Sequence, residues 1–78
     1  MNKAETINRL LLHDGKYYYL HVFQRKQGKN AGIYRARIHK GSYKSDPILI
    51  DAYSWKSAKT AEQNAIRQLN NSSFGGKA

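Results

Sequence analysis

Three stretches of the chain alternate between apolar and polar residues, and this period constrains the fold more than any other feature. The alternation is most regular in residues 32–40, "GIYRARIHK". One set of alternate residues is apolar and consists of Tyr34, Ala36 and Ile38. The other set is basic and consists of Arg35, Arg37 and His39. Successive side chains of a β-strand point to opposite faces of the sheet. The pattern therefore predicts a strand with one buried face and one basic face.

Two further segments fit the same description. Residues 16–25, "KYYYLHVFQR", are rich in aromatic and branched side chains, as strands are. One face would carry Tyr18, Leu20 and Val22, and the other Tyr17, Tyr19, His21, Phe23 and Arg25. In residues 48–54, "ILIDAYS", we expect Ile48, Ile50 and Ala52 on the buried side and Leu49, Asp51 and Tyr53 outward. Glycine-containing loops, "KQGKN" and "GSYKSDP", separate the three strands.

The period changes from two to 3.6 in residues 54–69, "SWKSAKTAEQNAIRQL", which predicts a helix. Its buried stripe consists of Ala58, Ala61, Ala65 and Leu69, with Ile66 on the flank. Ser54 or Ser57 is the expected N-cap, because a serine hydroxyl accepts a hydrogen bond from a free amide of the first turn. The opposite face carries Lys56, Lys59, Gln63 and Arg67.

Residues 4–12, "AETINRLLL", fit two alternatives. The helical spacing of Ala4, Ile7, Leu10 and Leu11 predicts a short helix. The dipeptide Asp14-Gly15 between apolar runs instead predicts a hairpin, with a strand before the turn. We expect an α+β domain over residues 1–70, in which a three-stranded antiparallel sheet packs on a C-terminal helix, with a short N-terminal helix (α-β-β-β-α). Residues 71–78 are expected to form a flexible tail.

Charge is the strongest global property of the chain. Its 78 residues include 14 Lys and Arg but only five Asp and Glu, for a net charge of +9. Eleven of the basic residues lie between Lys16 and Arg67, and so belong to the folded region. Such an excess favours a polyanionic partner, nucleic acid before an acidic protein or membrane. We expect a soluble, cytoplasmic protein, because cysteine, a signal peptide and a membrane-spanning run are all missing from the sequence.

Residues typical of catalysis are scarce. The three histidines lack metal-ligand spacing, the five acids form no obvious pair, and no serine lies in a nucleophile turn. We therefore expect no enzymatic activity, no cofactor and no metal.

Three basic elements are candidates for binding nucleic acid. The first is the start of the last helix, where Lys56 and Lys59 add charge to the positive end of the helix dipole, with Arg67 further along. Each lysine there costs about 0.3–1 kcal/mol, unless an anion binds. The second element is a loop with Arg25, Lys26 and Lys29. The third is the sheet face with Tyr17, Tyr19, Arg35 and Arg37, where aromatic rings stack on bases and arginine reads guanine.

The segment "SWKSAKTAEQNAIRQL" resembles the last helix of double-stranded-RNA-binding domains. That family opens this helix with two lysines, a variable residue, alanine and a lysine, and Lys56, Ala58 and Lys59 match the pattern. The resemblance implies that Lys56 and Lys59 grip phosphates across a major groove. Trp55 replaces the first lysine of the pattern, and the Gly-Pro-any-His signature of the family's hairpin loop is missing from "KQGKNAG". A contact from the family's first helix would fall near Glu5 or Asn8.

Two alternatives remain open at this stage. The order of three strands and a helix is also similar to the sheet-type DNA-binding domains of phage and transposon integrases and of plant AP2 factors, in which the sheet face binds. A different function is a phage- or mobile-element-type interaction module that inhibits an acidic or nucleic-acid-processing partner. The crowded aromatic residues between Tyr17 and Phe23 favour this second alternative.

Overall fold

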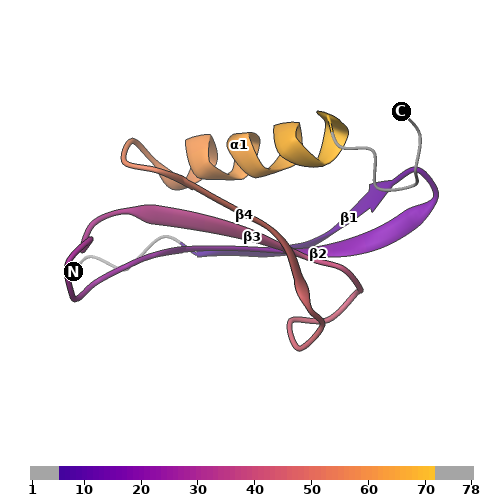
Figure 1. The fold of residues 1–78 in the computed structure, drawn as a ribbon, viewed down its shortest axis with the longest axis horizontal. Helices are drawn as coiled ribbons and strands as arrows, with labels where there is room; N and C mark the ends of the chain where they lie inside the picture. Colours follow the sequence, from indigo (N-terminus) through magenta and orange to yellow (C-terminus); the bar gives the residue numbers. More distant parts are fainter. Residues whose placement is uncertain (1–5, 72–78) are drawn as a thin grey trace.

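The computed structural model describes residues 6–71, which form four strands followed by one helix (Figure 1). The strands are β1 (Ile7–His13), β2 (Lys16–Gln24), β3 (Tyr34–His39) and β4 (Ile48–Ser54), and the helix is α1 (Ala58–Asn71). All neighbouring strands are antiparallel, in the order β1-β2-β3-β4. The α+β class and the C-terminal helix are confirmed, but the sheet has four strands rather than three. Asn71, which we expected in the tail, is the last residue of α1, and the rest of the expected tail, residues 72–78, lies outside the described residues.

The additional strand replaces the expected N-terminal helix. Residues 7–13 pair with β2 over their whole length, from Ile7 opposite Val22 to His13 opposite Lys16. Asp14 and Gly15 form the two-residue turn with φ values of 56° and 77°, the conformation that hairpin turns of this length require. The helical spacing was misleading. The two-residue turn at Asp14-Gly15 brings β2 alongside residues 7–13, so that their backbone groups pair with β2 instead of forming a helix. The helix prediction for residues 4–12 is therefore wrong over residues 7–12, where the hairpin alternative is correct, and residues 4 and 5 lie outside the described residues.

One face of the sheet forms the core together with α1. Tyr18, Leu20 and Val22 of β2 are buried there as expected, beside Ala36 and Ile38 of β3. The helix contributes Ala58, Ala61, Ala65 and Leu69, the stripe expected from the sequence. Alanines on both sides, including Ala36 and Ala52 of the sheet, leave room for the helix to approach closely. It packs mainly on β4 and β3, less on β2, and β1 is not among the strands that it covers.

A β-bulge reverses the expected orientation at the start of β4. Ile38 pairs with Ile50 and His39 pairs with Ile48, so that Leu49 is an extra residue on β4. Ile48 therefore shares the outer face with His39 and is 49% exposed, whereas Leu49 packs partly against the core. We expected Ile48 to be buried and Leu49 to point outward, and both predictions were wrong. A prediction from strict alternation leaves no place for the extra residue of a bulge. Beyond it, Ile50 and Ala52 are buried and Asp51 and Tyr53 are exposed, as expected.

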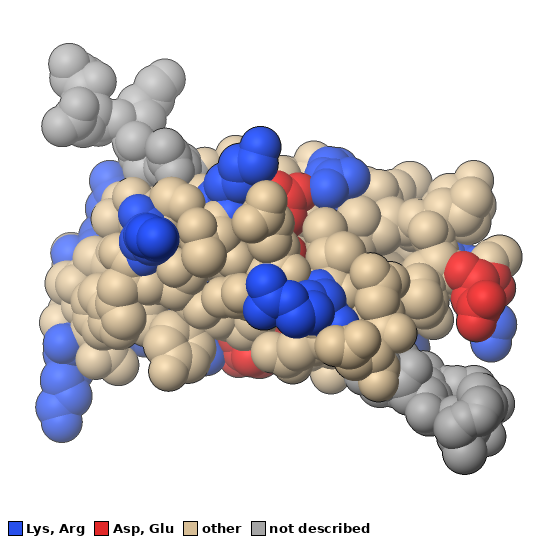
Figure 2. Space-filling model, turned by 90° about the horizontal axis from the view of Figure 1, so that it is seen from above, with Lys and Arg blue, Asp and Glu red and all other residues tan. Residues whose placement is uncertain are grey.

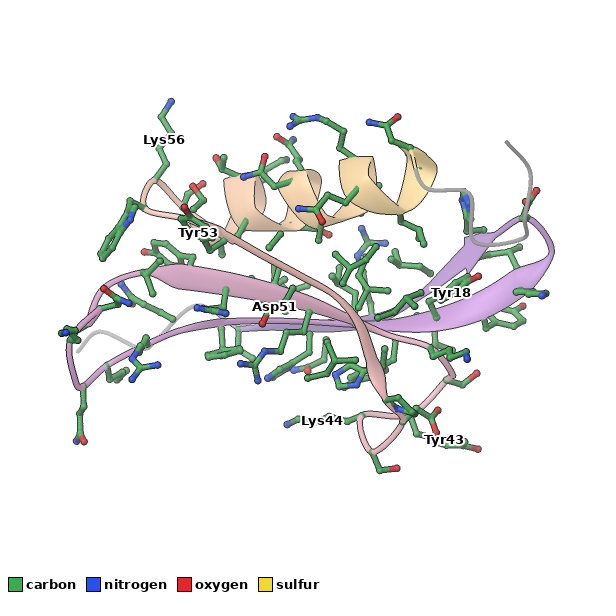
Figure 3. All side chains as sticks on the ribbon, in the orientation of Figure 1. Tyr18, Tyr43, Lys44, Asp51, Tyr53 and Lys56 are labelled. Carbon is green, nitrogen blue, oxygen red and sulfur yellow. The ribbon has the colours of Figure 1, made fainter. Side chains whose placement is uncertain are left out.

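The other face of the sheet, which we call the open face, is not covered by the helix. Register places side chains in rows across it: Asn8, His21, Arg37 and Asp51 form one row, and Leu10, Tyr19, His39 and Ile48 form the next. The loop between β3 and β4, with Tyr43 and Lys44, lies below this face in Figure 3. His39 is buried at that end, and its Nδ1 donates a hydrogen bond to the Asp46 carbonyl oxygen at 2.7 Å.

Within residues 6–71, no helix combines the length and the apolar character needed to cross a bilayer.

Candidate nucleic-acid interface

The loop between β2 and β3 is a compact, basic turn. Its ends are joined by hydrogen bonds from the Arg25 amide to the Ile33 carbonyl oxygen at 2.8 Å and from the Gly32 amide to the Arg25 carbonyl oxygen at 2.7 Å. The Arg25 guanidinium folds back on the loop and donates from Nε to the Gln27 carbonyl oxygen at 3.0 Å. Lys26 and Lys29 are exposed. The loop therefore uses Arg25 as a brace and presents the two lysines to solvent.

The connection from β4 to α1 is fixed by two serines. Ser54 Oγ accepts a hydrogen bond from the Lys56 amide at 3.0 Å. Ser57 is the N-cap: its Oγ accepts from the Thr60 amide at 3.1 Å, and its carbonyl oxygen accepts the first helical bond, from Ala61. The helix begins at Ala58, so Lys56 lies in the turn before it rather than inside it as the sequence suggested.

Both lysines of this connection are exposed. Figure 3 shows the Lys56 side chain projecting from the turn away from the sheet. Lys59 is the second residue of the helix, and the first turn contains no acidic residue. No carboxylate within the described residues pairs with either lysine. Their charges therefore remain available to a ligand.

These two basic segments meet at one end of the molecule. Figure 1 shows the β2–β3 loop and the turn before α1 at the same left-hand end. The two segments are neighbours because Tyr34 pairs with Ser54 at this end of the sheet, and a methyl group added at Gly32 would lie 4.0 Å from the Trp55 ring. We call this surface the basic end and define it by Arg25, Lys26, Lys29, Lys56 and Lys59. The sequence suggested that the loop and the helix start could act together, and the structure places both at the same end of the molecule.

The acidic residues of the described chain lie elsewhere. Asp51 pairs with two arginines of the open face, Arg35 at 2.9 Å and Arg37 at 3.6 Å. Glu62 accepts a hydrogen bond from Arg9 Nε at 3.0 Å, which ties β1 to the helix. In the view of Figure 2, blue Lys and Arg atoms gather at the left-hand end, and the red acidic atoms lie toward the middle and the right. Among the described residues, the ion pairs thus involve Arg9, Arg35 and Arg37 and leave the five cations of the basic end without a carboxylate partner.

The open face is less available than the sequence suggested. Arg35 and Arg37 share Asp51, and the Nε atoms of both arginines are buried without a hydrogen-bond partner within the described residues. The Arg37 guanidinium also lies over the face of the Phe23 ring, 5.2 Å from its centre. Base reading by these two arginines, which stays a prediction, would require them to leave these contacts.

The tyrosines of the open face differ in their accessibility. Tyr19 donates a hydrogen bond to Asn8 Oδ1 at 3.0 Å and is half-buried, whereas Tyr17 is 55% exposed. The His21 and Phe23 rings already stack on each other with centroids 5.1 Å apart. Of these two tyrosines, Tyr17 is therefore the one whose ring a ligand reaches more easily, and Tyr53 on β4 is equally exposed at 55%.

His21 lies in a positive environment on the open face. Burial, followed by the charges of Lys44, His39 and Arg37, lowers the pKa of His21. Lys44 projects from the β3–β4 loop below this face (Figure 3). Sequence reasoning missed Lys44, because nothing in "GSYKSDP" shows which way the loop folds. It also missed Asp51 as a partner of Arg35 and Arg37, although the expected β3–β4 pairing placed these residues on one face.

Arg67 lies on the helix away from the basic end. It belongs to an open groove between α1 and β4, which Asp51, Tyr53 and Asn64 also line. Its Nη1 donates to Asn64 Oδ1 at 3.3 Å, and Asn64 in turn donates to the Tyr53 carbonyl oxygen at 3.0 Å. Arg67 would meet a second part of a ligand that extends along the helix.

No cluster of three or more histidine and acidic side chains suited to a metal ion occurs within residues 6–71.

Comparison with known proteins identifies no relative: no protein-family model, no curated protein and no solved structure matches the chain. The resemblance to double-stranded-RNA-binding domains therefore depends on the helix segment alone and stays a prediction.

Proposed function

We propose that this protein is a cytoplasmic nucleic-acid-binding module that grips the phosphate backbone of a duplex with its basic end. The observation that carries the proposal is the meeting of two cationic segments, neither of which has a carboxylate partner within the described residues. Lysine ammoniums beside the free amides of a helix start are suited to phosphate oxygens. Lys56 and Lys59 would hold one phosphate row, and Lys26 and Lys29 would hold a second.

Salt dependence tests this proposal most directly. The four lysines and Arg67 would neutralise about five phosphates, so log affinity should fall with log salt concentration with a slope of about −4 to −5. A gel shift with duplex RNA, duplex DNA and single strands at several salt concentrations measures the slope and the preferred ligand. Because the helix motif resembles an RNA-binding family, we expect duplex RNA to compete best. Failure to bind any of these nucleic acids would overturn the proposal.

A charge-matched pair of variants locates the surface. Lys56→Gln with Lys59→Gln removes two phosphate contacts and should reduce the salt slope by about 2. Lys16→Gln with Lys40→Gln removes the same charge from exposed positions outside the basic end. We expect this control to keep the slope of the unmodified protein. Equal losses in the two double variants would show that net charge, rather than the basic end, determines binding.

One observation favours the alternative of a protein-interaction module. Large apolar side chains on the open face are exposed, among them Leu10, Leu12, Tyr17 and Ile48. Phosphate binding does not need such residues. If the open face binds a protein, affinity should depend little on salt, and Tyr17→Ala should weaken binding more than Lys59→Ala does. The same two variants thus separate the two functions.

A further inference from the structure

The two edges of the sheet differ in how they are protected. At β4, the bulge at Leu49 interrupts the edge, and Asn64 of the helix donates a hydrogen bond to the Tyr53 carbonyl oxygen at 3.0 Å. Bulges and covering side chains are known means by which proteins block strand addition. β1 pairs with β2 without a register shift, contains no proline, and is not covered by α1. Within residues 6–71, β4 is therefore the one edge strand that is protected.

The free edge of β1 presents regularly spaced backbone groups. His13 and Lys16 flank the two-residue turn and form a hydrogen-bonded pair, as the geometry of such hairpins requires. The ladder alternates from there, so the amides and carbonyl oxygens of Asn8, Leu10 and Leu12 point away from β2. The side chains of Leu10 and Leu12 are 50% and 64% exposed on the open face. The edge thus combines unpaired backbone groups with apolar side chains.

We propose that β1 pairs antiparallel with β1 of a second copy of this chain, around a two-fold axis at Leu10. The outward groups of Asn8, Leu10 and Leu12 are symmetric about Leu10, which is the middle residue of β1. In this register Leu10 faces its own counterpart, and Asn8 faces Leu12 of the second copy. Every outward amide and carbonyl group of the strand then gains a partner, and an eight-stranded sheet results.

The whole chain has a net charge of +9, but the local charge of β1 allows a second copy to pair at this edge. The only Lys, Arg, Asp or Glu in β1 is Arg9, and Glu62 already compensates it. The strand is therefore an apolar, electrically balanced segment of a strongly basic protein. The two whole chains still repel each other, so added salt should strengthen the dimer. Nucleic-acid binding has the opposite salt dependence, and the two proposals can fail independently.

Sedimentation equilibrium of the full chain tests the dimer. The mean mass should rise from that of one chain toward that of two as concentration increases, and this transition should move to lower concentration in high salt. Leu10→Lys places two like charges opposite each other at the axis and should raise the dissociation constant on the order of tenfold or more. A single-chain mass at all concentrations and salt levels would overturn the proposal.

Ile48→Lys is the matched control. Ile48 is 49% exposed, lies on the same open face and belongs to the opposite edge strand. The substitution adds the same charge and should leave the dimer intact, with circular dichroism confirming that both variants are folded. If Ile48→Lys and Leu10→Lys weaken association equally, the open faces stack and edge pairing is wrong.

Amide hydrogen exchange provides a second measurement. The Leu10 and Leu12 amides should exchange more slowly as protein concentration increases, and Leu10→Lys should abolish this protection. Dimerisation without protection of these amides would contradict strand pairing. If this protein stays monomeric and its β1 instead binds an extended strand of another protein, the assignment of a second copy is wrong.

Discussion

Gly15 occupies a backbone conformation that other residues adopt only with strain. Its φ is 77°, and no heavy atom lies within 4 Å of the position that a Cβ atom would take. Gly15→Ala therefore meets no steric obstacle and changes only the backbone energy, which should lower the free energy of unfolding by about 1–2 kcal/mol. Urea unfolding measures this difference. Asp14→Asn is the control, because asparagine is equally suited to the first turn position, and should leave stability unchanged.

The Asp14-Gly15 pair also shows what the sequence could reveal at this scale. Two residues predicted a hairpin correctly, because their preference for positive φ is a local property of the backbone. The helical spacing over residues 4–12 was weaker, since apolar residues at several spacings fit more than one period. Where a turn signal and a short periodic pattern conflict, the turn signal has the more direct physical cause.

His21 makes stability depend on pH. Burial and the nearby positive charges lower the pKa of His21, so the unfolded chain binds a proton at this residue more readily than the folded chain. The free energy of unfolding should therefore fall as pH decreases below the ordinary histidine value of about 6.5. In His21→Gln, the difference in stability between about pH 7.5 and about pH 5.5 should be smaller. An unchanged difference would show that His21 protonation does not contribute.

At the scale of elements, the cap of α1 links stability to binding. Ser57→Ala removes the acceptor of the Thr60 amide and should destabilise the protein by about 1 kcal/mol. Ser57→Asp keeps an acceptor and adds negative charge at the positive end of the helix dipole, so stability should equal or exceed that of the unmodified protein. The same carboxylate lies beside Lys56 and Lys59 and should weaken nucleic-acid binding. Urea unfolding and a gel shift on both variants check these opposite effects.

A variant Ser57→Asp that binds nucleic acid as tightly as the unmodified protein would contradict a phosphate site at the helix start. Ser57→Ala is the internal control, because it loses the cap without adding charge and should bind normally once folded.

The elements differ in how far the sequence predicted them. The buried stripe of α1 was correct residue by residue, since helical period and apolar character coincide there. The bulge at Leu49 was not predictable, because Ile48, Leu49 and Ile50 are all apolar and no composition signal separates them. The meeting of the β2–β3 loop with the helix start was also hidden. It arises from the antiparallel pairing of β3 with β4, which places Ser54 opposite Tyr34, and no local pattern encodes this pairing.

For the whole molecule, the excess of positive charge should act against folding. The described residues contain two ion-pair groups, around Asp51 and Glu62, which are too few to balance the excess of positive charge. Salt should therefore screen more repulsion than attraction and raise the melting temperature. If screening raises the free energy of unfolding by about 1 kcal/mol, the melting temperature should increase by about 4–8 °C for a domain of this size.

Calorimetry at low and high NaCl concentration measures this effect, and the Leu10→Lys variant excludes a contribution from dimers. In that background, Lys26→Gln with Lys29→Gln should reduce the salt-dependent increase, because less repulsion remains to be screened. A melting temperature that falls with salt would show that ion pairs outweigh repulsion.

The order of the elements has a consequence for synthesis of the protein. Each strand pairs with the one before it, so the sheet can grow as the chain leaves the ribosome. The helix that covers its apolar face follows all four strands. Until Ala58 to Leu69 have emerged, a nascent sheet would expose Leu20, Val22 and Ile38 to water, and exposed apolar surface of this kind favours aggregation.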